Sequence, residues 1–147
     1  MKARMMLLVV LGMLLMAAQA WAGDYTPHGD GTVTDNATGL MWQQDGSAIR
    51  NWEGALSYCQ EGGWANHTDW RLPNIKELES IVDDTIPYPW PTIDAVAFPN
   101  TPSSWYWSST TYANGPGNAW GVYFNFGYGS VNGKGGDGYV RCVRGGQ

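Results

Sequence analysis

Basic residues are scarce in this 147-residue chain, which has eight lysines and arginines against thirteen aspartates and glutamates. The net charge of −5 repels phosphate backbones and anionic headgroups, which argues against nucleic-acid and membrane-surface roles. A general affinity for sulfated polysaccharides is disfavoured for the same reason. Histidine is scarce too, with only His28 and His67 in the chain. Both lie in polar segments without a carboxylate or serine partner in the sequence pattern. No other catalytic constellation is visible, so we do not expect an enzyme.

Long apolar runs are missing from all but the start of the chain. Two basic residues precede an apolar run over residues 5–18, and Ala20 and Ala22 provide the small residues that signal peptidase recognises. The run is too short to span a bilayer comfortably and is typical of a signal peptide. We therefore predict that residues 1–22 are removed by cleavage after Ala22. The expected product is a secreted or periplasmic protein whose mature chain does not insert into a membrane.

Cysteine is limited to Cys59 and Cys142. In an exported protein such a pair is expected to form one disulfide, because the compartment is oxidising. Closing so long a loop stabilises the fold by about 4 to 5 kcal/mol in the chain-entropy model. Two free thiols, a metal site or a redox pair are the alternatives, although no neighbouring cysteine or histidine completes a set of metal ligands.

The mature chain divides into a polar segment over residues 23–31, one domain over residues 32–144 and a tail over residues 145–147. Alternating apolar residues and turn signals predict strands at both ends of the domain, at 32–34, 38–42, 105–110, 120–126 and 139–144. A glycine-rich turn is expected over residues 132–138, before the last strand.

Two helices are expected between these groups of strands. Asn51 is a suitable N-cap, the apolar residues of 52–59 recur at helical spacing, and Gly62 provides a stop. The second helix begins after Asn74, which forms a capping-box pattern with Glu77, and its apolar stripe occupies positions 75, 78, 81 and 82. A long proline-rich connection follows. This order of strands, two helices, a loop and further strands is that of an α+β fold.

Six sequence blocks follow one another in a characteristic order: TGLMW at 38–42, WEGALSYC at 52–59, DWRLPNIKEL at 69–78, YWSST at 106–110, AWGVYF at 119–124 and YVRCVR at 139–144. Together they resemble the Lcl C-terminal domain family, exported bacterial domains named after a collagen-like adhesin. The resemblance implies a distantly C-type-lectin-like fold, in which two helices pack on short antiparallel strands beside a long irregular loop. It also implies a disulfide from the first helix to the last strand. The chain lacks the Glu-Pro-Asn and Trp-Asn-Asp motifs of calcium-dependent lectins, so calcium-mediated sugar binding is not implied.

The last third of the chain combines aromatic residues with serine, glycine and asparagine, which is the composition of many binding loops. Sugar rings stack on tyrosine and tryptophan while asparagine binds hydroxyl groups, so the composition suits a glycan or protein ligand. Four residues are expected to face the core: Trp107, Trp120, Phe124 and Cys142. The residues expected to bind the ligand, on turns or on the opposite face, are Tyr112, Asn114, Asn118, Tyr123, Asn125, Tyr128, Asn132 and Lys134.

The predicted function is therefore that of an adhesin or surface-recognition module. A structural or assembly module of the bacterial envelope is the alternative, and self-association is left open. No cofactor is expected. Calcium is the alternative here, since four aspartates could supply hard oxygen ligands, but their spacing matches no calcium loop: Asp45, Asp83, Asp84 and Asp94.

Three arginines, Arg71, Arg141 and Arg144, are expected to fix the last strand to the helices. Their expected partners are Asp69, Glu77 and Glu79, near the second helix. Such ion pairs contribute little to stability where they are exposed.

Overall fold

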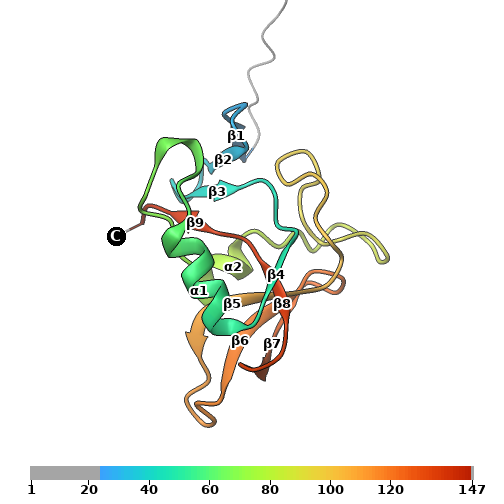
Figure 1. Cartoon of the computed structure of the whole chain (residues 1–147). Helices are drawn as coiled ribbons and strands as arrows, with labels where there is room; N and C mark the ends of the chain where they lie inside the picture. Colours follow the sequence, from blue (N-terminus) through green and yellow to red (C-terminus); the bar gives the residue numbers. More distant parts are fainter. Residues whose placement is uncertain (1–23, 147) are drawn as a thin grey trace, which may run out of the picture.

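The computed structural model describes residues 24–146, so the predicted signal peptide lies outside the described residues. Within that range two α-helices and nine short strands form a compact arrangement with two sheets, which confirms the α+β class (Figure 1). No helix in residues 24–146 is long and apolar enough to cross a membrane.

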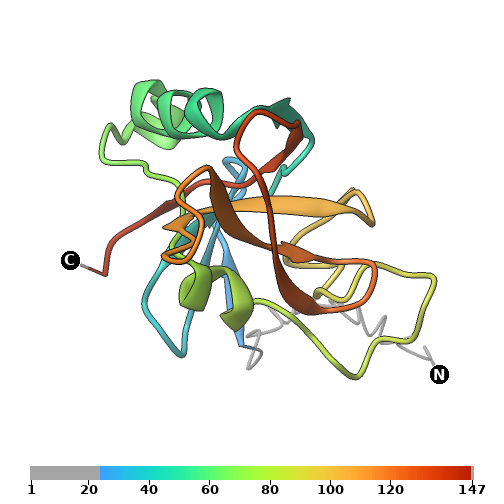
Figure 2. The ribbon, with the colours of Figure 1, turned by 90° about the horizontal axis from the view of Figure 1, so that it is seen from below.

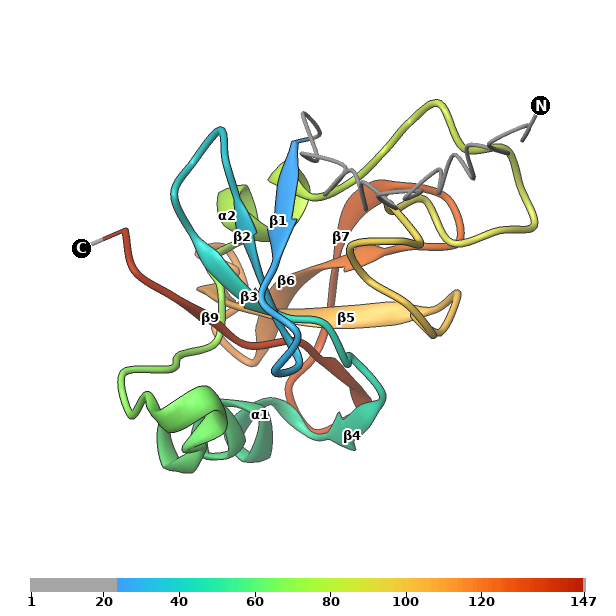
Figure 3. The same ribbon diagram turned by 90° about the horizontal axis from the view of Figure 1, so that it is seen from above.

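The smaller sheet has four antiparallel strands in the order β1-β2-β3-β9. They are β1 Tyr25–Pro27, β2 Thr32–Asp35, β3 Met41–Gln43 and β9 Val143–Arg144. The strands predicted at 32–34 and 38–42 are present as β2 and β3 and form a hairpin, whose turn depends on Gly39 with a φ of 73° that strains other residues. Strand β9 lies beside β3, so the end of the chain completes a sheet begun at its start (Figure 3). Strand β1 was not predicted.

The first helix, α1 (Trp52–Glu61), begins and ends where the sequence predicts. The Asn51 side chain accepts a hydrogen bond from the Gly54 amide at 2.9 Å, and the helix ends at Gly62. This capping fixes the rotation of α1 and places Cys59 on its buried face.

The second helix, α2 (Ile75–Ser80), has the predicted capping box but is shorter than predicted. Asn74 and Glu77 each accept a hydrogen bond from the other's backbone amide at 2.9 Å. The helix stops at Ser80, so two residues of the predicted apolar stripe lie beyond it. Ile81 is nevertheless buried, because the chain turns into the core there.

The larger sheet has five strands in the order β4-β8-β5-β6-β7. They are β4 Ala48–Arg50, β5 Trp105–Thr111, β6 Asn118–Tyr123, β7 Tyr128–Gly133 and β8 Gly138–Val140. Neighbours are antiparallel except β5 and β8, which run parallel. The predicted strand at 105–110 is confirmed. The predicted strand at 120–126 ends at Tyr123, and the predicted turn at 132–138 begins later because β7 extends to Gly133.

The two helices cover opposite faces of the larger sheet (Figure 2). On the α1 side, Ala55 and Cys59 pack with Trp105 and Trp107. Here the disulfide predicted between Cys59 and Cys142 is confirmed. On the α2 side, a second buried cluster continues into the smaller sheet and includes Leu78, Trp42, Tyr106, Val122 and Phe124.

The strand predicted over residues 139–144 is interrupted at Arg141 and Cys142, and each half belongs to a different sheet. The break lets one segment connect both sheets. Both residues at the break are completely buried. Of the residues expected in the core, Trp107, Phe124 and Cys142 are buried, while Trp120 is only half-buried.

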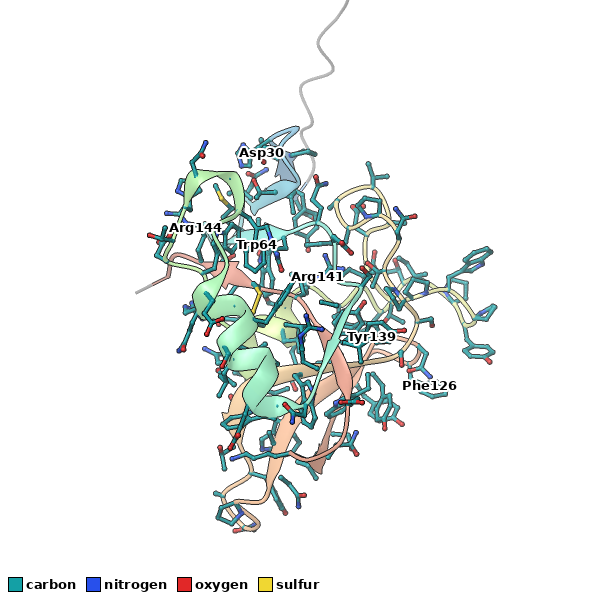
Figure 4. All side chains as sticks on the ribbon, viewed as in Figure 1. Asp30, Trp64, Phe126, Tyr139, Arg141 and Arg144 are labelled. Atoms are coloured by element: carbon teal, nitrogen blue, oxygen red, sulfur yellow. A yellow bond between two sulfur atoms is a disulfide. The ribbon has the colours of Figure 1, made fainter. Side chains whose placement is uncertain are left out.

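The ion pair predicted for Arg141 is wrong. Its guanidinium donates to the carbonyl oxygens of Gln43 and Gln44, both at 2.6 Å, and to Thr101 Oγ1 at 2.8 Å. The guanidinium carbon lies 4.7 Å from the centroid of the Phe98 ring. Complete burial lowers the pKa of Arg141, because the charged form loses its hydration. Figure 4 shows the side chain in the interior, where it joins three segments.

The other two arginines form ion pairs as predicted. Arg71 binds Glu77, with the closest nitrogen and oxygen 2.6 Å apart, and Arg144 binds Asp69 at 2.7 Å. Glu79 pairs instead with Lys76.

Candidate functional site

The most exposed aromatic side chains lie at one end of the larger sheet. Phe126 is 55% exposed in the β6–β7 turn, and Tyr128 is 52% exposed at the start of β7. Tyr88 and Trp90, in the proline-rich loop, are 70% and 67% exposed. Figure 4 shows Phe126 at the periphery of the molecule. Water therefore reaches large apolar rings that most folds of this size would bury.

Three of these rings, together with that of Tyr123, form a continuous line, which we call the aromatic row: Tyr88, Phe126, Tyr128 and Tyr123. The Tyr88 and Phe126 rings lie 5.9 Å apart between centroids, with planes 8° from parallel. Phe126 and Tyr128 lie 5.7 Å apart, with planes 15° from parallel. Tyr123 follows Tyr128 at 5.9 Å and is tilted by 53°. The three exposed members therefore stack on one another with nearly parallel planes.

The inner end of the row is anchored in the core. Tyr123 lies opposite Trp105 on the neighbouring strand, with the ring centroids 4.8 Å apart. The Asn132 amide donates to the Tyr123 hydroxyl at 3.3 Å. Trp105 is 5% exposed, so the row runs from solvent to a buried tryptophan.

Backbone hydrogen bonds hold the proline-rich loop against the β6–β7 turn. The backbone amide and hydroxyl of Thr92 both donate to the Phe124 carbonyl oxygen, at 2.7 and 2.8 Å. Phe124 is buried, and Gly127 allows the turn to close with a φ of 77°. The exposed rings of the proline-rich loop and of the β6–β7 turn therefore lie on one surface, which these hydrogen bonds hold in place.

Three of the eight predicted ligand-binding residues lie in or beside this row: Tyr123, Tyr128 and Asn132. Asn125 lies half-buried in the β6–β7 turn, and its side-chain oxygen has no hydrogen-bond partner among residues 24–146. Tyr123, Asn125 and Tyr128 therefore lie at the turn end of the β6–β7 hairpin, whereas Asn132 pairs with Ala119 near the other end and reaches the row through the Tyr123 hydroxyl.

The remaining predicted residues lie at the other end of the hairpin. Tyr112 packs against Trp120, with the ring centroids 5.6 Å apart. Asn114 lies in the turn that precedes β6, and Asn118 is the first residue of β6. Lys134 donates to Thr111 and its ammonium lies 3.9 Å from the centroid of the Trp52 ring. Tyr123 lies five positions along β6 from Asn118, roughly 16 Å along a strand. The predicted residues therefore do not form one site.

Three exposed aromatic residues were missed. Phe126 was placed on the apolar face of a longer strand, which is wrong because the strand ends at Tyr123. Tyr88 and Trp90 were passed over as loop residues. Their position between prolines was a usable signal, because a loop stiffened by proline can present large rings at a small entropic cost.

Acidic residues gather around a cavity of about 670 Å³ between β1, the β2–β3 turn and the segment after α2. Asp83, Asp84 and Asp94 line it, whereas Asp45 does not. The Asp83 and Asp94 carboxylates accept hydrogen bonds from amides of their own loops. Within residues 24–146, no group of three potential ligand residues is arranged to hold a metal ion.

The profile of the Lcl C-terminal domain matches residues 31–144, which is most of the chain. No curated protein sequence matches it.

Proposed function

The chain belongs to the Lcl C-terminal domain family, and from the geometry of the aromatic row we propose that this member is an exported binding module for glycans. The observation that carries the proposal is the exposure of three neighbouring aromatic rings, Tyr88, Phe126 and Tyr128, which stack on one another into one ordered apolar surface. The C–H groups on a sugar face can pack against the aromatic surface that this stack leaves exposed. The row is supported by hydrogen bonds, so little order has to be gained on binding.

We assign the ligand to neutral glycans. No member of the aromatic row is charged, and two carboxylates lie beside it, of which that of Glu79 is paired with Lys76. The Asp84 carboxylate lies beside Gly127 in the turn, and that of Glu79 lies beside Gly129 in β7. With the net charge of −5, these groups repel sulfated or uronic-acid chains. Hydroxyl groups of a neutral sugar can bond the Asn132 amide and the tyrosine hydroxyls.

The proposal includes a secreted or periplasmic location and a C-type-lectin-like fold. The location rests on the signal-peptide pattern over residues 1–22. The fold relationship is supported by the disulfide between α1 and the end of the chain, together with the long irregular loop. The proposed role is binding without catalysis, and it requires neither calcium nor another cofactor.

The test is a glycan array probed with residues 23–147, in calcium and again with chelator. Wild type should bind neutral glycans in both conditions. Tyr88→Ser combined with Tyr128→Ser should abolish the signal, because two of the stacking faces are removed. Tyr112→Ser is the matched control, since it removes an equal ring at the far end of the hairpin and should bind as wild type does.

Three outcomes would contradict the proposal. Equal binding by the double variant would exclude the row, and loss of binding in chelator would require a metal site. An array that stays silent with folded, oxidised wild type would reject a glycan ligand and favour the alternative of a structural or assembly role with an envelope protein.

A further inference from the structure

Strand β7 is the one sheet edge in residues 24–146 that lacks an evident guard. An unpaired edge can join the strand of another chain, and proteins block this with short strands, prolines, charges or covering segments. Edge β1 has three residues and contains Pro27, and edge β4 has three and contains Arg50. Edge β9 has two residues and is hydrogen-bonded to Arg71. Edge β7 has six residues, with neither a charge nor a proline.

Alternation of backbone groups along β7 identifies which ones face outward. The Lys134 amide donates to the Gly117 carbonyl oxygen, on the β6 side. In an antiparallel pair the residues bonded to the partner strand alternate with residues whose amides point away. The register pairs Asn132 with Ala119 and Ser130 with Gly121, so these positions face β6. The backbone groups of Gly129, Val131 and Gly133 therefore point away from β6.

We infer that β7 pairs antiparallel with β7 of a second copy of this chain, around a twofold axis at Val131. The sequence Gly-Ser-Val-Asn-Gly over 129–133 is nearly symmetric about its centre. In this register valine lies opposite valine, glycine opposite glycine, and Ser130 opposite Asn132 of the second copy. All three outward-facing positions find a partner, which a shift of the register would not achieve. A strand of unrelated sequence would not form these matched pairs, which is why we favour a second copy of the chain as the partner.

Such a dimer joins the two larger sheets into one (Figure 1 shows β7 beside β6 at the rim of this sheet). Tyr128, Ser130 and Asn132 alternate with the outward-facing residues and share one sheet face. Both copies of Tyr128 therefore lie on the same face of the joined sheet, and two aromatic rows are presented together. Linked sites of this kind strengthen the binding of a repetitive ligand through effective concentration. The dimer does not depend on the proposed glycan binding.

Sedimentation equilibrium over a wide concentration series, with no glycan present, tests the inference. Wild-type residues 23–147 should reach twice the monomer mass, and more readily at higher salt, because screening weakens repulsion between two acidic copies. Val131→Pro removes an outward N–H group and leaves the bonds to β6 in place, so it should remain monomeric. Val131→Thr keeps the N–H group and a branched side chain, and should dimerise as wild type does.

Ser130→Glu provides an independent disruption, because it adds a negative charge to the uncharged edge without changing the backbone. It should also be monomeric, and it decides the question if the proline variant unfolds. Far-UV circular dichroism and thermal unfolding establish that each variant is folded. A wild type that stays monomeric at every concentration, or a dimer that persists in folded Ser130→Glu, overturns the inference.

Discussion

Replacement of Arg141 by methionine tests the least expected feature of the core. The guanidinium is completely buried and makes three hydrogen bonds, to Gln43, Gln44 and Thr101. Hydrogen bonds to a charged group contribute about 1.5 to 3 kcal/mol each, so their loss costs roughly 4.5 to 9 kcal/mol. Removing the charge also recovers a desolvation cost of several kcal/mol. We expect a net loss of about 3 kcal/mol in the free energy of unfolding.

Lysine at position 141 should destabilise at least as much as methionine does. Its ammonium keeps the buried charge but lacks the planar fork that reaches acceptors on separate segments. Denaturant titration followed by tryptophan fluorescence measures both variants, and a loss of about 3 kcal/mol lowers Tm by roughly 12 °C. Arg144→Met is the control, since Arg144 pairs with an exposed carboxylate and should change stability much less.

The reasoning would be refuted if Arg141→Met unfolded at the same denaturant concentration as wild type. A lysine variant as stable as wild type would equally show that the charge, rather than the fork, is what the core requires.

Three further predictions concern stability. Replacing Cys59 and Cys142 with serine should lower the free energy of unfolding by about 4 to 5 kcal/mol, measured in urea, and a smaller loss would show that the unfolded chain is already compact. Burial raises the pKa of Glu77, but hydrogen bonds from Arg71 and Asn74 outweigh this effect and hold the pKa below its usual 4.5. The ionised carboxylate therefore stabilises the fold fully above pH 4.5, and this stabilisation is lost as the pH falls through the lowered pKa. When Tm is measured against pH, it should fall more steeply below pH 4.5 in wild type than in Glu77→Gln. Parallel Tm curves for the two proteins would contradict this prediction. Asn51→Ala should lower the free energy of unfolding by about 1 kcal/mol, because it removes the N-cap of α1. An unchanged Tm would show that this cap does not stabilise the fold.

Local signals predicted the parts of the fold that local physics decides. Both helix starts were found because Asn51 and Asn74 satisfy exposed amides within a few residues, whatever the rest of the chain does. The β2 and β3 strands were predicted from local alternation and turn residues, and Gly39 has the left-handed φ that the turn between them needs. The disulfide followed from having two cysteines in a chain with a predicted signal peptide.

Features that depend on distant segments were not predictable in this way. Val140 and Cys142 share one face, as they would in a single strand. The strand is nevertheless interrupted at Arg141 and Cys142, and β8 and β9 belong to different sheets. At the interruption the Arg141 guanidinium binds a carbonyl group nearly a hundred residues earlier in the chain. An arginine in sequence gives no sign of being buried without a carboxylate. Strand β4 was missed because it is only three residues long and pairs with β8, far along the chain.

The binding surface was half predicted for a similar reason. Composition and pattern indicated Tyr123, on the non-core face of the predicted strand at 120–126, and Tyr128, in the glycine-flanked turn expected after it. Tyr88 reaches them through the Thr92 hydrogen bonds to Phe124, a contact between segments about thirty residues apart that no local pattern records. Phe126 was expected on the apolar face of the strand predicted at 120–126, because the strand period was extended beyond the true end of β6 at Tyr123.

The most direct test of the central claim is a two-dimensional NMR titration of labelled residues 23–147 with a neutral oligosaccharide selected on the array. The account predicts the largest chemical-shift changes at the aromatic rings of Tyr88, Phe126 and Tyr128, with little change at Tyr112. Shifts confined to residues 112–118, or to the acidic cavity around Asp83, would contradict a binding site on the aromatic row.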